Sequence, residues 1–251
     1  MIYLFGHKGF VGSGIADYFI KNNIEFTHID RDNYSSFKGT KCSIFINAAG
    51  SSKKLLASKE PVLDFEKNFI STFNTLFDFR YDKYVYLSTI DVYDDFININ
   101  NNSEEHEIFE GNLSNYGFNK YLAEKVVRKY ADKWLILRLG GMVGVNLKKN
   151  VVFDLLTNKN LYVHPESEYQ YINTSEVAEI IVKLSKFDNE IFNICGDGVI
   201  TPKEIADKLG IELNPEFYNL RRDKYVINID KLKRYHKVSK TKETVFEFII
   251  K

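Results

Sequence analysis

The chain has 251 residues, 44% of them hydrophobic, which is enough for one large domain or for a large domain carrying a small second lobe. Its 34 lysines and arginines balance 34 acidic residues, so the net charge of zero excludes a strong overall attraction to nucleic acid or anionic lipid. The two cysteines, Cys42 and Cys195, lack disulfide or zinc-site spacing, and no uncharged run could cross a bilayer, so we expect a cytoplasmic protein.

Short β-rich runs alternate with amphipathic segments through the first two-thirds of the chain. The runs that resemble strands are Ile2 to Phe5, Phe26 to Asp30, Cys42 to Ala49, Lys83 to Thr89 and Trp134 to Leu139. The helix candidates, with apolar residues at three-to-four spacing, are Phe10 to Lys21, Pro61 to Phe79, Tyr116 to Ala131 and Thr174 to Leu184. This alternation predicts an α/β fold with a Rossmann-like, doubly wound parallel sheet.

The alternation loosens after about Gly144, which predicts a small C-terminal substrate lobe. We expect residues 1–146 to form a dinucleotide-binding domain to which residues 172–198 return, and residues 147–171 and 199–251 to form the lobe. Residues 94–115, rich in Asn, Asp and Glu, predict a surface loop. Thr201 begins a predicted helix with a capping box, and Gly210 ends it.

The segment between the first strand and the first helix reads Gly6-His7-Lys8-Gly9-Phe10-Val11-Gly12. A backbone that turns sharply and passes close to a pyrophosphate has no room for a Cβ, and the helix N-terminus offers unpaired N–H groups to the phosphates. Because an acid follows the second strand, the pattern predicts a dinucleotide site. Its expected contacts are Gly6, Lys8, Gly9, Phe10, Val11 and Gly12.

That acid is Asp30, at the end of the second predicted strand. A carboxylate there can accept both ribose hydroxyls and repel a 2′-phosphate, which favours NAD. Arg31 follows directly, and an arginine can clamp a 2′-phosphate, so NADP remains an alternative cofactor. Asp30 as a simple turn residue is a further alternative.

Tyr116 and Lys120 lie four residues apart on a predicted helix, so their side chains leave the same face. A free phenol has a pKa of about 10, and a nearby cation lowers it toward the working pH of a general acid or base. In a chain with 16 tyrosines, a solvated helix face could produce the same spacing by chance.

With these motifs the chain resembles the extended short-chain dehydrogenase/reductase superfamily, in its NAD-dependent epimerase/dehydratase branch that acts on nucleotide sugars. The resemblance runs nearly end to end. Further landmarks, in the family's order, are Asn47-Ala48-Ala49-Gly50, Lys67 to Thr72, Leu87 to Tyr93, Leu137 to Gly144, Tyr171 to Ala178 and Phe192 to Gly196.

The resemblance implies roles for residues that match its motifs. Thr89 would hydrogen-bond the reacting oxygen, Tyr116 would exchange the proton, and Lys120 would hold the nicotinamide ribose while lowering the pKa of Tyr116. Further cofactor contacts are expected at Asn47, Ala48, Ala49, Asn68 and Ser88, although a structural amide is an alternative for Asn68.

The chain also departs from the family pattern. Common 4,6-dehydratases place Asp and Glu after the threonine, whereas this chain has Ile90 and Asp91, which disfavours dehydration. Gly141 stands where many epimerases have a substrate-binding asparagine. The expected substrate contacts are Asp91, Gly141, Asn150 and Arg221, with solvated charge as the alternative for Arg221.

The resemblance implies hydride transfer between a nicotinamide and a carbon of a nucleotide-activated sugar. We favour an epimerase, with a nucleotide-sugar 4-ketoreductase as the alternative. A redox-sensing regulator is the alternative from another class, but such proteins usually lose the tyrosine or lysine. The five scattered histidines predict no metal site. We expect a homodimer through the 61–79 and 116–131 helices, with no nucleic-acid or membrane partner.

Overall fold

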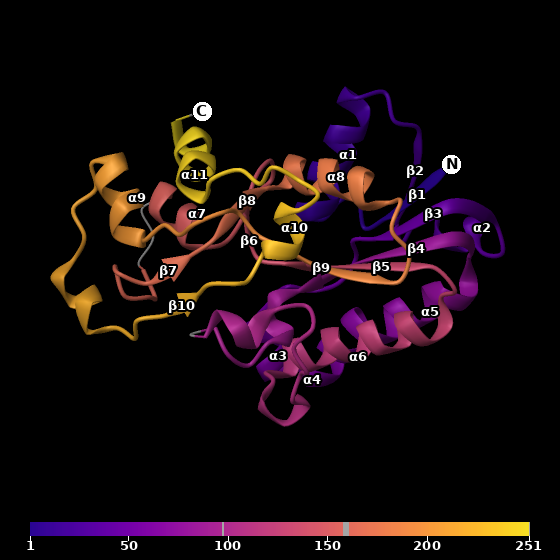
Figure 1. Cartoon of the computed structure of the whole chain (residues 1–251), viewed down its shortest axis with the longest axis horizontal. Coiled ribbons are helices and arrows are strands. Elements are labelled where there is room, and N and C mark those ends of the chain that lie inside the picture. Colours follow the sequence, from indigo (N-terminus) through magenta and orange to yellow (C-terminus); the bar gives the residue numbers. More distant parts are fainter. Residues whose placement is uncertain (97, 158–160, 251) are drawn as a thin grey trace.

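The computed structural model describes residues 1–96, 98–157 and 161–250. Within these residues a parallel six-stranded sheet has the order β2-β1-β3-β4-β5-β9 (Figure 1). The strands are β1 (Ile2–Phe5), β2 (Phe26–Ile29), β3 (Lys41–Asn47), β4 (Arg80–Thr89), β5 (Trp134–Leu139) and β9 (Glu190–Ile194). The predicted α/β fold with a parallel doubly wound sheet is confirmed.

Helices cover both faces of this sheet (Figure 1). One face carries α1 (Phe10–Lys21) and α8 (Thr174–Leu184), and the other carries α5 (Ser71–Asp78) and α6 (Asn115–Tyr130). A Cβ at Gly14 of α1 would lie 2.3 Å from the Thr174 hydroxyl oxygen, so the glycine lets α1 and α8 pack closely. Separate apolar clusters fill the two faces, as expected for a sheet buried on both sides.

The predicted helix from Pro61 to Phe79 is interrupted. It consists of α4 (Pro61–Phe65), a π-helical turn (Glu66–Ile70) and α5, which follow one another without a break. The apolar spacing did not reveal the π turn, because a single wider turn barely shifts the apolar face. Two short helices also lacked a sequence signal, namely α2 (Tyr34–Phe37) and α3 (Lys54–Lys59).

The C-terminal part packs around a third apolar cluster. Its strands pair outside the main sheet, β6 (Gly141–Val143) with β8 (Tyr171–Asn173) and β7 (Glu168–Tyr169) with β10 (Lys224–Tyr225). Its helices are α7 (Val151–Leu156), α9 (Pro202–Leu209), α10 (Asp230–Lys233) and α11 (Thr241–Ile250). The capping box of α9 and its left-handed end at Gly210, with φ 68°, are confirmed. The domain boundary near residue 146 stays a prediction.

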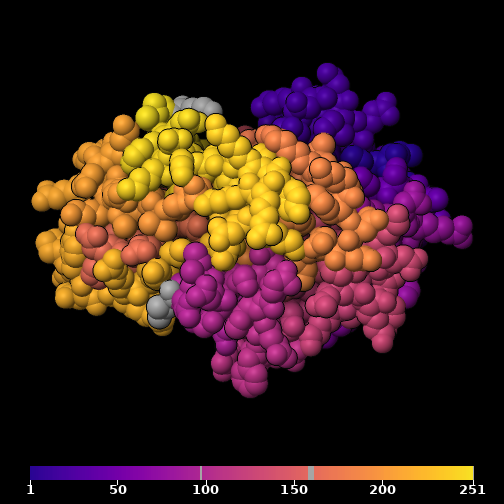
Figure 2. All heavy atoms as spheres, viewed as in Figure 1, coloured from indigo at the N-terminus to yellow at the C-terminus, as the bar shows by residue number. Residues whose placement is uncertain are grey.

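The segment predicted as a surface loop is partly buried. It contains the 3-10 turns Ile99–Asn102 and Glu110–Asn112. The Asn102 side chain is fully buried, donates to the Val226 carbonyl at 2.8 Å and accepts from the Asn228 N–H at 2.8 Å. Figure 2 shows C-terminal residues lying against this magenta segment. Its polar composition therefore serves an interface as well as solvent. Among the described residues, no helix combines the length and apolarity of a membrane span.

Candidate active site

The glycine segment passes directly beside the turn that follows β3. Gly6 has φ +90°, and a Cβ on it would lie 2.7 Å from the Ala49 nitrogen. A Cβ on Gly12 would lie 2.2 Å from the Gly6 carbonyl oxygen. Gly9 is the N-cap of α1 and has no side chain to cap the first amides. The strand order reverses between β1 and β3, and open α/β sheets bind ligands at this switch point.

Asp30 lies immediately after β2, and its carboxylate is already engaged. The Lys8 ammonium, from the glycine segment, is 2.6 Å from one oxygen of Asp30 and 3.2 Å from Asp32. The other Asp30 oxygen accepts from the Asp32 N–H at 2.9 Å. The hydrogen bond from Lys8 lowers the pKa of Asp30 to about 2. Arg31 is exposed. The lysine between the glycines thus partly neutralises the acid expected to select NAD.

Two buried asparagines support the turn after β3. Asn47 donates to the Tyr84 hydroxyl at 2.8 Å and accepts from the Ala49 N–H at 3.1 Å. Asn68, in the π turn, accepts from the Ser51 N–H at 2.9 Å and donates to the Ser51 carbonyl at 3.1 Å. Both side chains are therefore occupied in shaping the Ala48–Ala49 backbone, which fits the structural alternative for Asn68.

Thr89, Tyr116 and Asp91 come together at the end of β4. The Thr89 hydroxyl donates to the Asp91 carboxylate at 3.0 Å and forms a hydrogen bond with the Tyr116 phenol. A Cβ on Gly117 would lie 2.1 Å from the Asp91 carbonyl oxygen, so this glycine lets α6 approach the 3-10 turn Ile90–Val92. The predicted catalytic hydroxyls are thus neighbours, and the predicted substrate residue Asp91 joins them.

Lys120 is buried beneath this group but points elsewhere. Its ammonium donates to the Leu87 carbonyl at 2.7 Å and lies 4.2 Å from the centre of the Tyr86 ring. Burial lowers the pKa of Lys120 to about 7, while the charges of Glu124 and Asp64 raise it.

The expected depression of the Tyr116 pKa is wrong for the chain without ligand. Burial raises that pKa and the Asp91 charge adds to the rise, while the hydrogen bond with Thr89 opposes it. The reason is that the lysine ammonium is directed to the Leu87 carbonyl, so the phenol is desolvated without a cation bonded to it.

The sequence motifs do not single out two fully buried acids near Lys120. Glu124 pairs with Arg138 at 2.8 Å and accepts from the Ser88 hydroxyl at 2.5 Å. Ser88 is therefore bonded to the helix rather than free for the cofactor. Asp64 accepts at 2.8 Å from both Asn68 and Asn119. The four-residue spacing of Tyr116, Lys120 and Glu124 could have revealed Glu124, because all three share one helix face.

The remaining predicted substrate residues have structural roles or lie apart. A Cβ on Gly141 would lie 2.5 Å from the Gln170 carbonyl oxygen, so close strand packing accounts for this glycine. Asn150, with φ 141°, caps α7 by accepting from the Phe153 N–H at 2.9 Å and donates to the Met142 carbonyl at 2.9 Å. Arg221 is highly exposed and pairs with Asp223 at 3.4 Å.

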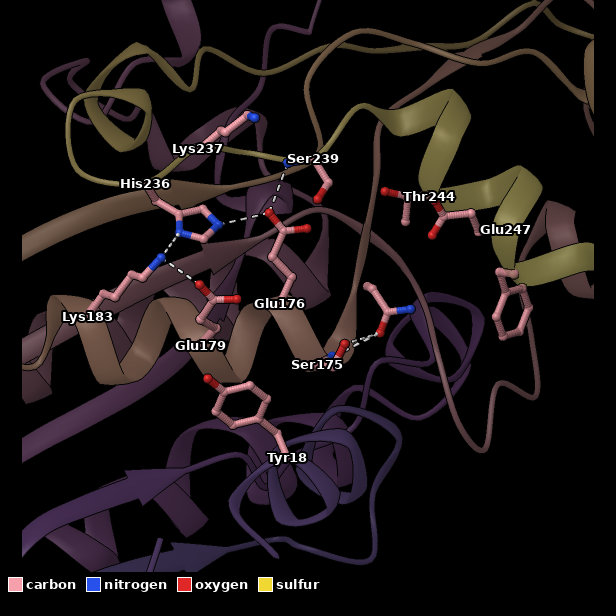
Figure 3. A pocket seen from close by; sticks show the side chains of 12 residues that line it. Tyr18, Ser175, Glu176, Glu179, Lys183, His236, Lys237, Ser239, Thr244 and Glu247 are labelled. Atoms are coloured by element: carbon pink, nitrogen blue, oxygen red, sulfur yellow. Dashed lines mark hydrogen bonds and ion pairs between the residues drawn. The ribbon is translucent and has the colours of Figure 1, made fainter. Parts of the chain in front are cut away.

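A separate cavity of about 520 Å³ lies between α1, α8 and α11. Inside it His236 is 2.9 Å from Glu176 and 3.1 Å from the Lys183 ammonium (Figure 3). Glu176 also accepts from the Ser239 N–H at 2.9 Å. These contacts tie α8 to the C-terminal segment. None of the predicted site residues lines this cavity.

Comparisons with known proteins agree with this geometry. Residues 2–195 match the model of the NAD dependent epimerase/dehydratase family. A UDP-galactose 4-epimerase structure has 21% identity and a TM-score of 0.77, covering 99% of this chain and 97% of that one. The dTDP-4-dehydrorhamnose reductase of Bacillus anthracis, in complex with NADP, has 18% identity and a TM-score of 0.80 over the same shares.

A further structure, the UDP-glucose 4-epimerase of Thermus thermophilus in complex with NAD, has 18% identity and a TM-score of 0.77, covering 99% of this chain and 97% of that one. No curated protein matches the sequence significantly. The family is NAD dependent by its description, in agreement with the predicted cofactor. The chain belongs to the NAD dependent epimerase/dehydratase family.

Proposed function

We propose that the chain catalyses NAD(H)-dependent hydride transfer on a nucleotide-activated sugar, with epimerisation as the favoured reaction. The observation that carries this proposal is the meeting of Thr89 and Tyr116 above Lys120, at the sheet edge that also presents the glycine segment. The solved epimerases and the reductase share this fold. The 4-ketoreductase remains the second candidate, because one proton-donating tyrosine serves either reaction.

The residues divide the work in a definite way. The glycine segment and the first turn of α1 would hold the pyrophosphate, and Asp30 would accept ribose hydroxyls. NAD supplies the hydride acceptor when bound. Thr89 would orient the sugar hydroxyl, and Tyr116 would take or return its proton. Because burial raises the pKa of Tyr116, the Lys120 ammonium and the positive nicotinamide would have to lower it for proton transfer near neutral pH.

A thermal-shift panel tests the proposal even though the base and the sugar of the substrate are open. We expect NAD to raise the melting temperature and one of the UDP-, dTDP-, GDP- or CDP-sugars to raise it further, because each binds only the folded chain. With C4-deuterated NADH, label transfer and release of NAD would identify a reductase, whereas isomerisation without net cofactor consumption would identify an epimerase. Absence of any shift with NAD would refute the proposal.

The cofactor preference should follow Asp30. We expect NAD(H) to bind more tightly than NADP(H), and Asp30→Ala to narrow the gap, because the variant loses both the ribose contact and the repulsion of a 2′-phosphate. Fluorescence titration with NADH and NADPH measures both affinities. Asp32→Ala is the matched control, since Asp32 meets the same lysine but is exposed. Tighter NADPH binding by the unmodified protein would make Arg31 and Lys8 the controlling residues.

The assembly should be a two-fold dimer through α5 and α6. Along these helices the Phe73, Phe77 and Tyr130 rings form contacts of 5.0 to 5.8 Å, and 59% of Phe77 remains exposed. An apolar ridge of this kind favours burial against its own copy. We expect Phe77→Glu to weaken the dimer at least about tenfold in light scattering. Tyr162→Glu, at an exposed lobe position, should leave the mass unchanged. A monomeric wild type at micromolar concentration would contradict the prediction.

A further inference from the structure

A lysine-rich hollow opens beside the Asp91 side of the candidate active site. Its volume is about 470 Å³, and we call it the lysine pocket. The lining residues are Lys53, Lys54, Leu55, Leu56, Lys59 and Lys149. All except Lys149 come from α3 and the residue before it, and Lys149 comes from the segment before α7. None of the described residues that line the pocket carries a carboxylate.

Lys54 connects the lysine pocket to the reacting group. Its ammonium lies 2.5 Å from one oxygen of Asp91, whose other oxygen accepts from the Thr89 hydroxyl at 3.0 Å. The same ammonium lies 4.9 Å from the centre of the Tyr225 ring in the lobe. One carboxylate therefore separates the pocket wall from the hydroxyl proposed to orient the substrate. A ligand group in the pocket would belong to the part of the substrate near the reacting carbon.

The charge in the lysine pocket is unbalanced. Four lysines face the single Asp91 carboxylate, which leaves three positive charges in excess within a chain of zero net charge. Among the described residues, Lys53, Lys59 and Lys149 form no ion pair, and Lys149 donates to the Ser52 carbonyl. Burial lowers the pKa of Lys149, and the neighbouring Lys54 and Lys53 lower it further. An anion in the pocket would relieve this repulsion.

We propose that the lysine pocket binds a carboxylate carried by the sugar ring, so that the substrate is an acidic nucleotide sugar of the uronic acid class. This inference rests on the proposed function and narrows its substrate. The diphosphate is disfavoured as the occupant because Lys54 is tied to Asp91 and Thr89 at the reacting end of the sugar. A sugar carboxylate reaches that end, and several ammonium groups can share its oxygens.

A matched pair of ligands without a nucleotide base tests this proposal whichever base the enzyme uses. Glucuronic acid 1-phosphate and glucose 1-phosphate differ only in the carboxylate. Their dissociation constants are measured by NMR titration of the lysine side-chain signals, with NAD present to occupy the cofactor site. We expect the uronic acid to bind about tenfold more tightly to the wild type, because hydrogen bonds to charged groups are strong. The double variant Lys53→Met and Lys149→Met should remove this difference.

Lys21→Met is the control, because Lys21 pairs with Asp17 on the exposed side of α1 and should keep the difference. Thermal melting confirms that each variant is folded. Equal binding of the two ligands by the wild type overturns the proposal, as does a difference that survives in the double variant. Equal weakening of both ligands would assign the lysines to the phosphate and also overturn it. Failure of NAD to bind, measured separately, counts against the proposed function instead.

Discussion

Tyr116→Phe should reduce turnover by roughly 10²-fold or more, because it removes the hydroxyl proposed to exchange a proton with the substrate. The ring keeps its place against α6 and the end of β4, so dinucleotide binding should stay close to that of the wild type. The loss should appear in kcat rather than in cofactor affinity. Steady-state kinetics on a nucleotide sugar identified by thermal shift, together with NADH titration, measure the two effects separately.

Tyr121→Phe is the matched control for this substitution. Tyr121 lies on the same helix, and its ring contacts the Lys125 ammonium rather than Thr89. Its loss of a hydroxyl should leave turnover within about twofold of the wild type, as for a surface change that touches no reacting group. Full turnover by Tyr116→Phe would refute the proposed mechanism. A wild type that binds NAD and turns over no nucleotide sugar would favour the redox-sensing regulator.

Lys120→Met should lower both turnover and cofactor affinity, each by roughly tenfold or more, because one ammonium is proposed to hold the nicotinamide ribose and to lower the Tyr116 pKa. The methionine preserves most of the side-chain volume. An effect on turnover with unchanged NAD affinity would remove the ribose role from Lys120. An unchanged enzyme would remove both roles.

The pH dependence of stability checks that Lys120 is desolvated as the structure indicates. Its pKa is lowered to about 7 in the folded chain. The unfolded lysine has a pKa of about 10.4, so between these values the unfolded chain binds more protons and the free energy of unfolding rises with pH. Between pH of about 7 and about 8.5 the wild type should gain roughly 1 kcal/mol over Lys120→Met in urea denaturation. Equal gains would contradict the burial of a neutral lysine.

Local patterns predicted the parts of the site that depend on one stretch of chain. The glycine segment was predictable because close backbone approach at Gly6 and Gly12 excludes a Cβ, and the helix period placed Tyr116 and Lys120 on one face. The direction of the Lys120 ammonium was not predictable, because its partner is the Leu87 carbonyl, which lies 33 residues away on β4.

Contacts between distant segments account for the rest. Glu124 finds Arg138 on β5, and Asp64 finds Asn119 on α6, and neither spacing is regular in the sequence. The lysine pocket likewise joins α3 to Lys149 from a later segment. Apolar periodicity describes which face of a helix is buried, but it does not say which polar groups from other elements meet there.

The most direct test of hydride chemistry at this site follows the hydrogen itself. A nucleotide sugar deuterated at its ring carbons is mixed with the NAD-loaded protein, the reaction is quenched with acid, and the cofactor is analysed by mass spectrometry. We predict that the cofactor recovered from the wild type carries deuterium and that the cofactor from Tyr116→Phe carries far less at the same time. Turnover of the sugar with a cofactor that never acquires deuterium would contradict the account.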